Sequence, residues 1–139
     1  MANAESAASV LDASAVLALL NDEEGSEVVT DAIADGAAIS VVNLAEVLSK
    51  VAERGGDPAT AAAELRKAEG SKRALTIEPL TAADCVALAQ LRPITKQRGL
   101  SLADRACLAL SERLGVPALT TDEAWEDVPY LGVEVRLIR

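Results

Sequence analysis

Four acidic side chains in this sequence have the chemistry and spacing to hold a divalent cation. Three follow short apolar segments that are expected to be strands, and the fourth opens a strongly apolar helical segment. If the strands lie parallel in one sheet, these side chains collect at its carboxyl edge, where open α/β sheets bind ligands. Clustered carboxylates without histidine or lysine suit hard divalent cations better than proton transfer. The four residues are Asp12, Glu46, Asp104 and Asp122.

The elements that would position these acids alternate along the chain. Apolar runs and turn signals predict strands at residues 8–11, 37–42, 74–77, 117–120 and 133–138. Helical spacing predicts helices at 14–20, 24–34, 44–54, 58–68, 82–91 and 102–114, and Pro93 is expected to start a further short helix. This alternation, without a tight hairpin signal, implies right-handed crossovers and a parallel sheet. We expect one α/β domain over residues 1–139.

The composition excludes several enzyme classes. The 139 residues include no histidine, so a Ser-His-Asp triad and imidazole-based nucleases are impossible. Cys85 and Cys107 lack metal-site spacing and are expected to be small buried residues in a reducing compartment. No apolar stretch reaches the length of a membrane span, and the first residues lack a secretory pattern. We expect a soluble, cytoplasmic protein without membrane contact.

Charge is distributed unevenly along the chain. The formal net charge is −9, and residues 1–49 carry nine acids and no base. Residues 50–113, in contrast, carry eleven Lys and Arg against eight Asp and Glu. A polyanion would therefore have to meet the middle third of the chain, with metal ions masking the acidic pocket.

Each acid also has a simpler structural explanation. Glu46 and Asp104 fit the capping-box spacing, in which an acid bonds the amide at the start of its own helix. Asp12 and Asp122 could likewise stabilise a helix N-terminus. Asp84 fits the same box outside the candidate set and serves as an internal control. Singly, each acid is better explained as a cap. Together they favour a metal, because carboxylates about 4 Å apart repel by about 4 kcal/mol.

Four segments resemble, in order and spacing, the successive acidic motifs of PIN domains, especially those of VapC-like toxins from bacterial toxin–antitoxin pairs. They are VLDASA, SVVNLAEVL, GLSLADRACLAL and ALTTDEAW, within about residues 9–127. The resemblance implies a three-layer α/β/α fold whose parallel five-stranded sheet has the order 3-2-1-4-5. It also implies a Mg²⁺- or Mn²⁺-dependent endoribonuclease that hydrolyses RNA phosphodiester bonds as a toxin. Its implied partners are a small cognate antitoxin and a second copy in a homodimer.

The resemblance assigns roles to individual positions. The family's catalytic metal ligands correspond to Asp12, Glu46, Asp104 and Asp122. Ser14 stands at the family's hydroxyl position, two residues after the first acid. Asn43 and Thr121 stand where polar residues often support the acids. Because the segment after the fourth acid varies in such proteins, Glu126 or Asp127 could share its role.

Basic residues near the acids are candidates for contacts with RNA phosphates. Lys50 and Arg54 lie one and two helical turns beyond Glu46 on roughly its face, and Arg105 follows Asp104. Lys50 could instead form an ordinary helical pair with Glu46, and any single base is better explained as solvated surface. With one Trp and no Phe, base stacking cannot dominate, so recognition should follow RNA shape and backbone.

Two alternatives stay open at this point. Helices near residues 26–34 and 44–52 could form an apolar groove for a partner helix, or ordinary core faces, which are favoured. The chain could also be a non-catalytic PIN-like module that binds RNA or protein and keeps its acids as a vestige. The complete set of four acids argues against that second alternative.

Overall fold

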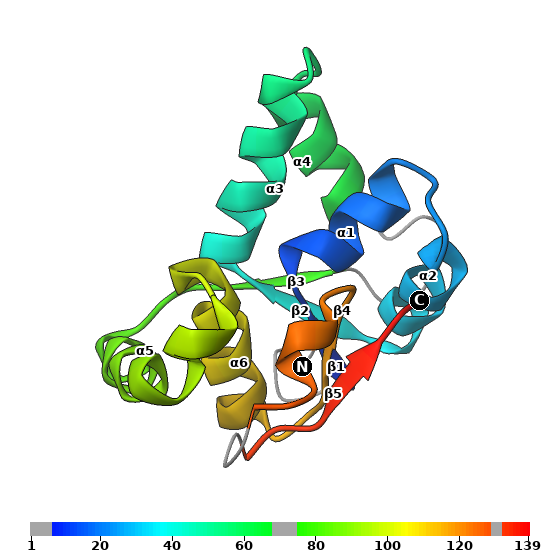
Figure 1. The fold of residues 1–139 in the computed structure, drawn as a ribbon. Coiled ribbons are helices and arrows are strands. Elements are labelled where there is room, and N and C mark those ends of the chain that lie inside the picture. The colour runs from blue at the N-terminus through cyan, green and yellow to red at the C-terminus, as the bar shows by residue number, and fades with distance from the viewer. Residues whose placement is uncertain (1–6, 68–74, 129–131) are drawn as a thin grey trace.

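Five parallel strands form the central sheet of this protein, whose computed structural model describes residues 7–67, 75–128 and 132–139 (Figure 1). The strands pair in the order β3-β2-β1-β4-β5, and every pairing is parallel. The expected fold class and strand order are therefore confirmed. The strands are β1 Ser9–Leu11, β2 Ala37–Ser40, β3 Thr76–Glu78, β4 Ala118–Thr120 and β5 Val135–Leu137.

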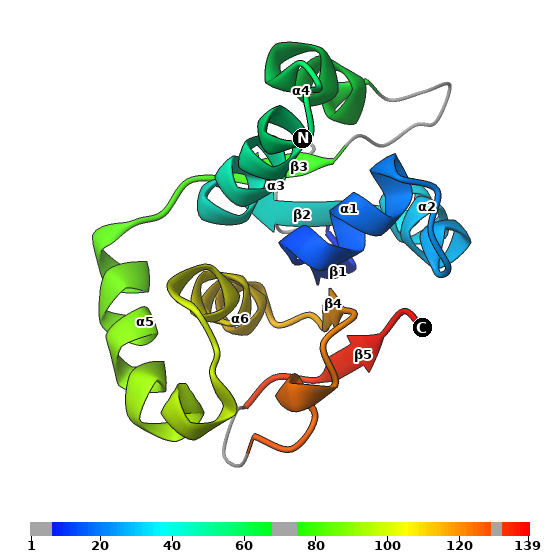
Figure 2. The same cartoon turned by 45° about the horizontal axis from the view of Figure 1, so that its top comes forward.

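Helices cover both faces of the sheet (Figures 1 and 2). Because strand side chains alternate between faces, Val10, Ala38 and Ala118 pack with α5 and α6, whereas Leu11 and Ile39 pack with α1, α2 and α3. No helix within the described ranges is long and apolar enough to cross a membrane. The helices are α1 Ala13–Leu20, α2 Ser26–Asp35, α3 Val41–Glu53, α4 Pro58–Arg66, α5 Ala82–Thr95 and α6 Leu102–Leu114, with 3-10 turns η2 Lys96–Arg98 and η3 Glu123–Trp125.

Helix α3 begins earlier than expected. The strand expected to reach residue 42 ends at Ser40, and the helix starts at Val41. The Ser40 hydroxyl accepts a hydrogen bond from the amide of Asn43 at 3.1 Å and so caps the helix. Glu46 therefore lies one turn inside α3 and not at the capping-box position, and its explanation as a cap is wrong.

Helix α5 is longer than expected, because it continues through Pro93 to Thr95. Pro93 lies in the last turn, so its missing amide removes only one late intrahelical hydrogen bond. Ala89, whose carbonyl would accept that bond, is exposed, so water can replace it. The following turn ends at Gly99, whose φ of 73° lies in the left-handed region that favours glycine.

The two cysteines differ in exposure. Cys107 is fully buried in α6, as expected, whereas Cys85 is exposed on α5, and the expectation of burial is wrong there. Helix α5 turns Asp84, Leu88 and Leu91 inward. Cys85 follows Asp84 directly and therefore lies on the outer side of the helix.

The two helices considered as a partner groove contribute to the core. Val29 of α2 and Val47 of α3 are both fully buried in the cluster that covers the α1 face of the sheet. The favoured interpretation of these two helix faces as core is therefore confirmed.

Candidate metal centre

The four candidate acids lie on elements that meet at the carboxyl edge of the sheet (Figure 1). Asp12 directly follows β1, and Asp122 lies two residues beyond β4. Glu46 is in the second turn of α3, and Asp104 is in the first turn of α6. The parallel strands thus bring residues far apart in sequence to one end of the domain.

Asp12 is the most deeply buried of the four, with 3% of its surface exposed. Its Oδ1 accepts hydrogen bonds from the amide of Ala15 at 2.8 Å and the hydroxyl of Ser14 at 2.7 Å. The hydroxyl of Thr120 donates to Oδ2 at 2.6 Å. Burial raises the pKa of Asp12 to about 6, although these bonds oppose the rise, and the charge of Asp104 adds to it.

Two hydroxyl groups join the ends of β1 and β4. The Thr120 hydroxyl oxygen accepts from the amide of Asp122 at 3.0 Å, and that of Ser14 accepts from the amide of Thr121 at 3.0 Å. Because both hydroxyls also donate to Asp12, they hold its carboxylate in a defined position relative to the segment that carries Asp122.

Thr120 is a supporting residue that the sequence did not indicate, since the neighbouring Thr121 was assigned that role. The parallel register explains the difference. Leu11 pairs with Leu119, so the next residues along the two strands, Asp12 and Thr120, lie side by side. Aligning the segments VLD and ALT in register is the signal that would have identified Thr120.

Glu46 has a buried carboxylate oxygen, Oε1, that finds no hydrogen-bond partner among the described residues. Burial raises the pKa of Glu46, the charge of Asp104 raises it further, and Lys50 opposes the rise. Asn43, one turn earlier on α3, is fully buried and donates to the carbonyl of Ala103 at 3.1 Å. An unpaired buried carboxylate oxygen is costly, so a bound cation at this position would relieve an existing penalty.

Asp104 is a helix cap and also the central member of the acidic group. Its Oδ2 accepts the amide of Ser101 at 2.8 Å, and the Ser101 hydroxyl accepts the amide of Asp104 at 3.1 Å. Burial raises the pKa of Asp104 against these bonds, and the charge of Asp122 adds to the rise. Asp104 in turn raises the pKa of both Asp12 and Glu46. Capping and membership of the acidic group therefore coexist in one residue.

Asp122 is the exposed member of the group. Its Oδ1 accepts the amide of Ala124 at 2.9 Å and so caps η3. Its charge raises the pKa of Asp104, and its backbone amide donates to the Thr120 hydroxyl.

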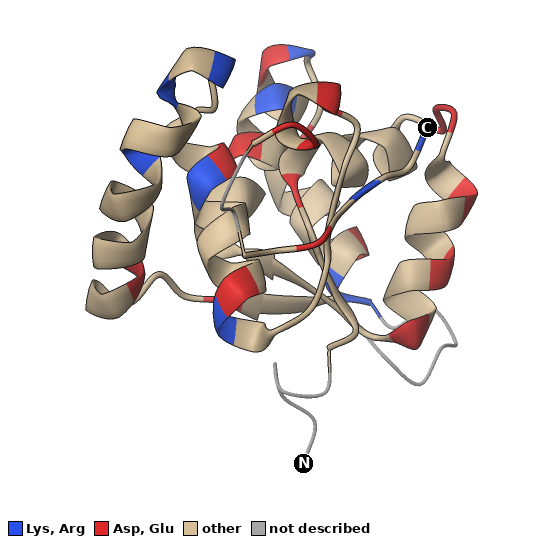
Figure 3. Cartoon of the chain, turned by 60° about the horizontal axis from the view of Figure 1, so that its bottom comes forward, with Lys and Arg blue, Asp and Glu red and all other residues tan. Residues whose placement is uncertain are grey.

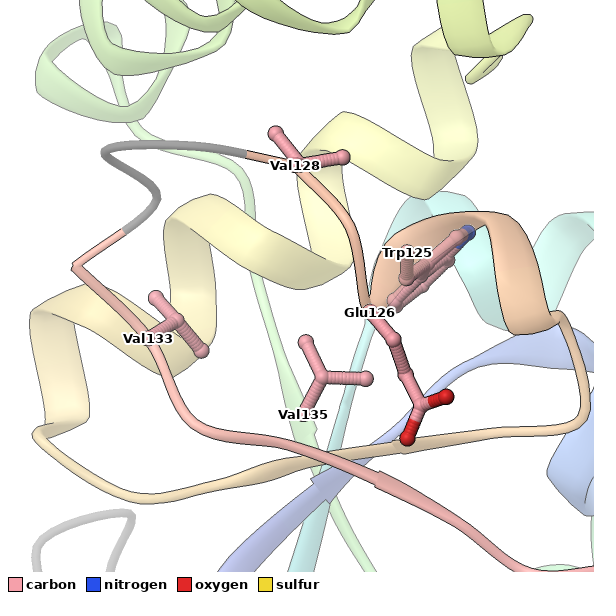
Figure 4. A pocket seen from close by; sticks show the side chains of 5 residues that line it. All are labelled: Trp125, Glu126, Val128, Val133 and Val135. Atoms are coloured by element: carbon pink, nitrogen blue, oxygen red, sulfur yellow. The ribbon is translucent and has the colours of Figure 1, made fainter.

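Glu126 and Asp127, the two later acids considered for the same role, have different neighbours from Asp122. Glu126 lines a hollow of about 150 Å³ together with Trp125 and the valines at 128, 133 and 135 (Figure 4). Asp127 forms an ion pair with Arg98 at 3.6 Å. Of these three acids, Asp122 is the one whose charge raises the pKa of Asp104.

Asp84 shows what a structural acid looks like at the same capping-box position. Its Oδ2 accepts the amide of Thr81 at 3.0 Å, and Arg113 contacts Oδ1 at 3.0 Å. Burial opposes ionisation of Asp84, but the bonds from Thr81 and Arg113 together outweigh it and lower its pKa. Asp104 has the same cap without a comparable cation partner, and its pKa moves in the opposite direction.

The donor set fits a hard divalent cation that keeps part of its water shell. Within residues 7–67, 75–128 and 132–139, no group of three or more Asp, Glu or Cys side chains is arranged so that it could hold a metal ion through all of them. Mg²⁺ commonly binds through one or two carboxylates and retains several waters. Asp104 interacts through its charge with Asp12, Glu46 and Asp122, and Glu46 has an unpartnered buried oxygen, so the carboxylates that such a cation would use lie in one electrostatic environment.

The three candidate RNA-binding residues have different surroundings. Lys50 is exposed and pairs with Glu53 at 3.8 Å, and Arg54 is exposed at the end of α3. Arg105 is half-buried, and its Nη1 donates to the carbonyl of Leu88 at 2.9 Å, so it links α6 to α5. Lys50 and Arg54 are therefore more available than Arg105 for contact with RNA.

The acidic and basic side chains lie on different parts of the surface, as the uneven distribution of charge along the chain predicts. Helix α2 bears acidic side chains and no basic ones, whereas basic side chains occur along α5 and η2 (Figure 3). An anionic ligand would be repelled by the α2 side of the molecule.

The metal-free protein is expected to lose stability as pH rises from about 4 to about 6. The pKa of Asp12 is about 6 in the folded protein and 3.8 otherwise, so the folded state binds this proton more tightly. Protonated Asp12 therefore contributes about 3 kcal/mol to the free energy of unfolding at low pH, and this contribution is lost as the pH rises through 6. Denaturant titrations across this range measure it. Asp12→Asn should flatten the slope, and an unchanged slope in that variant would contradict the assignment.

The fold and site together define a parallel α/β domain with acids gathered at its carboxyl edge. The family model described as PIN domain matches residues 9–130, and the chain belongs to this family. No curated protein matches it. The resemblance to PIN domains is therefore confirmed, and solved structures that share the fold include VapC and VapBC proteins.

Three solved structures illustrate the similarity in fold. VapBC2 from Rickettsia felis, bound to a promoter DNA fragment, has a TM-score of 0.70 and 15% identity over 93% of this chain and 97% of that chain. VapC20 from Mycobacterium tuberculosis, a sarcin-ricin loop cleaving toxin, has a TM-score of 0.69 and 19% identity over 91% and 98%. DNA-bound VapBC from Salmonella typhimurium has a TM-score of 0.67 and 18% identity over 94% and 98%.

Proposed function

We propose that this chain is a Mg²⁺- or Mn²⁺-dependent endoribonuclease that acts as the toxin of a toxin–antitoxin pair. The observation that carries the proposal is the shared environment of Asp12, Glu46 and Asp104, where burial raises all three pKa values and the charge of a neighbouring acid adds to each rise, Asp104 for the first two and Asp122 for Asp104. Membership of the PIN family and similarity in fold to a toxin that cleaves the sarcin-ricin loop support it.

Each side chain has a distinct part in the proposed reaction. Asp12 and Asp104 would bind the cation directly, and Glu46 and Asp122 directly or through water. When bound, the cation lowers the pKa of a water molecule, orients it and offsets the charge that develops on the RNA phosphate. The hydroxyls of Ser14 and Thr120 keep the Asp12 carboxylate in place.

The direct test is cleavage of total RNA by purified protein with Mg²⁺ or Mn²⁺, with EDTA as control, followed by sequencing of the RNA ends. We expect metal-dependent cuts at defined sites. Binding of Mn²⁺ without any cleavage would overturn the nuclease assignment and favour a non-catalytic PIN module.

Cleavage should fall steeply with salt, because RNA is held through its backbone. Lys50 and Arg54 are exposed on the helix that carries Glu46. Replacing both with Ala should raise KM and reduce the salt slope by about 0.7 per lost phosphate contact. Initial rates over a range of salt concentrations measure this. Arg136→Ala, which removes an exposed base on β5 paired with Glu134, should leave the slope unchanged. Equal slopes in all three proteins would refute the contact.

The proposed partners are RNA, a small antitoxin and a second copy of the chain. A toxin–antitoxin complex from Klebsiella pneumoniae is among the structures with this fold, which supports an antitoxin that covers the acids. The homodimer is proposed from the resemblance of the acidic motifs to those of PIN-domain toxins.

A further inference from the structure

One buried amide connects the two helices that carry Glu46 and Asp104. Asn43 lies in the first turn of α3 and is fully buried. Its Nδ2 donates to the carbonyl of Ala103 at 3.1 Å, and Ala103 directly precedes Asp104 on α6. Asn43 and Glu46 are three residues apart on α3 and so share a face of the helix. The hydrogen bond therefore spans the two helices beside the acids themselves.

The orientation of this amide is fixed from both ends. The Ser40 hydroxyl donates to Asn43 Oδ1 at 2.6 Å and accepts the Asn43 backbone amide. The Ala103 carbonyl can only accept, so the NH₂ group must face it. The neighbours of Asn43 on α3, Val42 and Leu44, each pack against one of the two apolar clusters of the core, and an apolar side chain of similar size would avoid the desolvation of an amide. Stability alone does not explain why an amide occupies this position. A requirement for one fixed distance between α3 and α6 does explain it.

We infer that Asn43 is a positioning residue of the metal centre, whose amide sets the separation of Glu46 on α3 from Asp104 on α6. This inference rests on the proposed function. Glu46 Oε1 has no hydrogen-bond partner among the described residues, so the placement of the helix is what locates that oxygen. Asn43 acts through Glu46 and need not touch the cation or the RNA.

Calorimetric titration with Mn²⁺ of wild type, Asn43→Leu, Glu46→Gln and the double variant tests this role. We expect Asn43→Leu to bind Mn²⁺ about tenfold to a hundredfold more weakly, as for other residues that orient metal ligands. The double variant should bind no more than about twofold more weakly than Glu46→Gln, because Asn43 acts through Glu46. Cleavage by Asn43→Leu, assayed well below the metal-free Tm of the variant so that the protein is already folded, should recover at high Mn²⁺.

Thr95→Val is the matched control. Thr95 is equally buried and donates to the Leu91 carbonyl at 2.8 Å within α5, so its loss should lower Tm and leave Mn²⁺ affinity unchanged. If Asn43→Leu does not unfold cooperatively, Ser40→Ala removes the group that orients the amide and should weaken binding in the same direction. Unchanged Mn²⁺ affinity in Asn43→Leu and Ser40→Ala, or additive losses of affinity in the double variant, would overturn the inference about Asn43 and leave the proposed function standing. Absence of Mn²⁺ binding by wild type would overturn the proposed function and this inference with it.

Discussion

Replacing Asp12 with Asn is expected to reduce RNA cleavage at least about a thousandfold, or about 4 kcal/mol of transition-state stabilisation. Asn has nearly the same size and can still accept the amide of Ala15 that caps α1. It lacks the negative charge that a cation requires. Single-turnover cleavage of a labelled RNA in Mn²⁺ measures the loss, and the Tm of the variant reports whether the fold is intact.

Asp57→Asn is the matched control for this variant. Asp57 is also an N-cap aspartate, at the start of α4, where its side chain accepts the amide of Ala59 at 3.4 Å. It is fully exposed and lies outside the acidic group. Its replacement should leave cleavage within about twofold of wild type. Equal activity of the Asp12 and Asp57 variants would show that Asp12 is only a cap.

Asp104→Asn is expected to abolish the rise in Tm that Mn²⁺ gives to the wild-type protein. That rise corresponds to about 2.7 kcal/mol when Mn²⁺ is present at about a hundred times its Kd. The metal-free Tm should stay unchanged or increase. Asn can still accept the Ser101 amide, and neutralising this side chain removes its repulsion with Asp12, Glu46 and Asp122. Thermal unfolding with Mn²⁺ and with EDTA measures both effects.

Asp84 occupies the same capping-box position as Asp104, but Asp84→Asn is expected to have the opposite effects on stability and on the response to Mn²⁺. This change weakens the contacts with Arg113 at 3.0 and 3.2 Å, so it should lower stability by about 1 to 3 kcal/mol. The Mn²⁺-dependent rise should persist. If Asp104→Asn kept the rise, or if both variants lost it, the distinction between ligand and cap would fail.

Much of the fold follows from patterns that act over short distances. The helix at 102–114 and its end at Gly115 agree with the structure, because a strong apolar face and a glycine in the left-handed region determine both. The alternation of strands and helices determines a parallel sheet. The boundary of α3 was misplaced, since a run of β-branched residues at 41 and 42 favours a strand, whereas the Ser40 cap begins the helix.

The site was only partly predictable, because side-chain contacts across strands depend on register. The positions of the four acids follow from the ends of the elements, but the choice of Thr120 over Thr121 depends on the pairing of β1 with β4. The direction of Arg105 toward the Leu88 carbonyl depends on how α5 packs on α6. Neither contact can be predicted from the spacing of residues within one segment of the sequence.

The most direct measurement is anomalous diffraction from crystals of the wild-type protein soaked in Mn²⁺. We expect one or two anomalous peaks within about 2.5 Å of carboxylate oxygens of Asp12 or Asp104, with Glu46 and Asp122 adjacent. Crystals of Asp104→Asn should lose that signal. Peaks confined to other surfaces, or no peak while these four carboxylates remain accessible, would contradict a metal centre at this edge of the sheet.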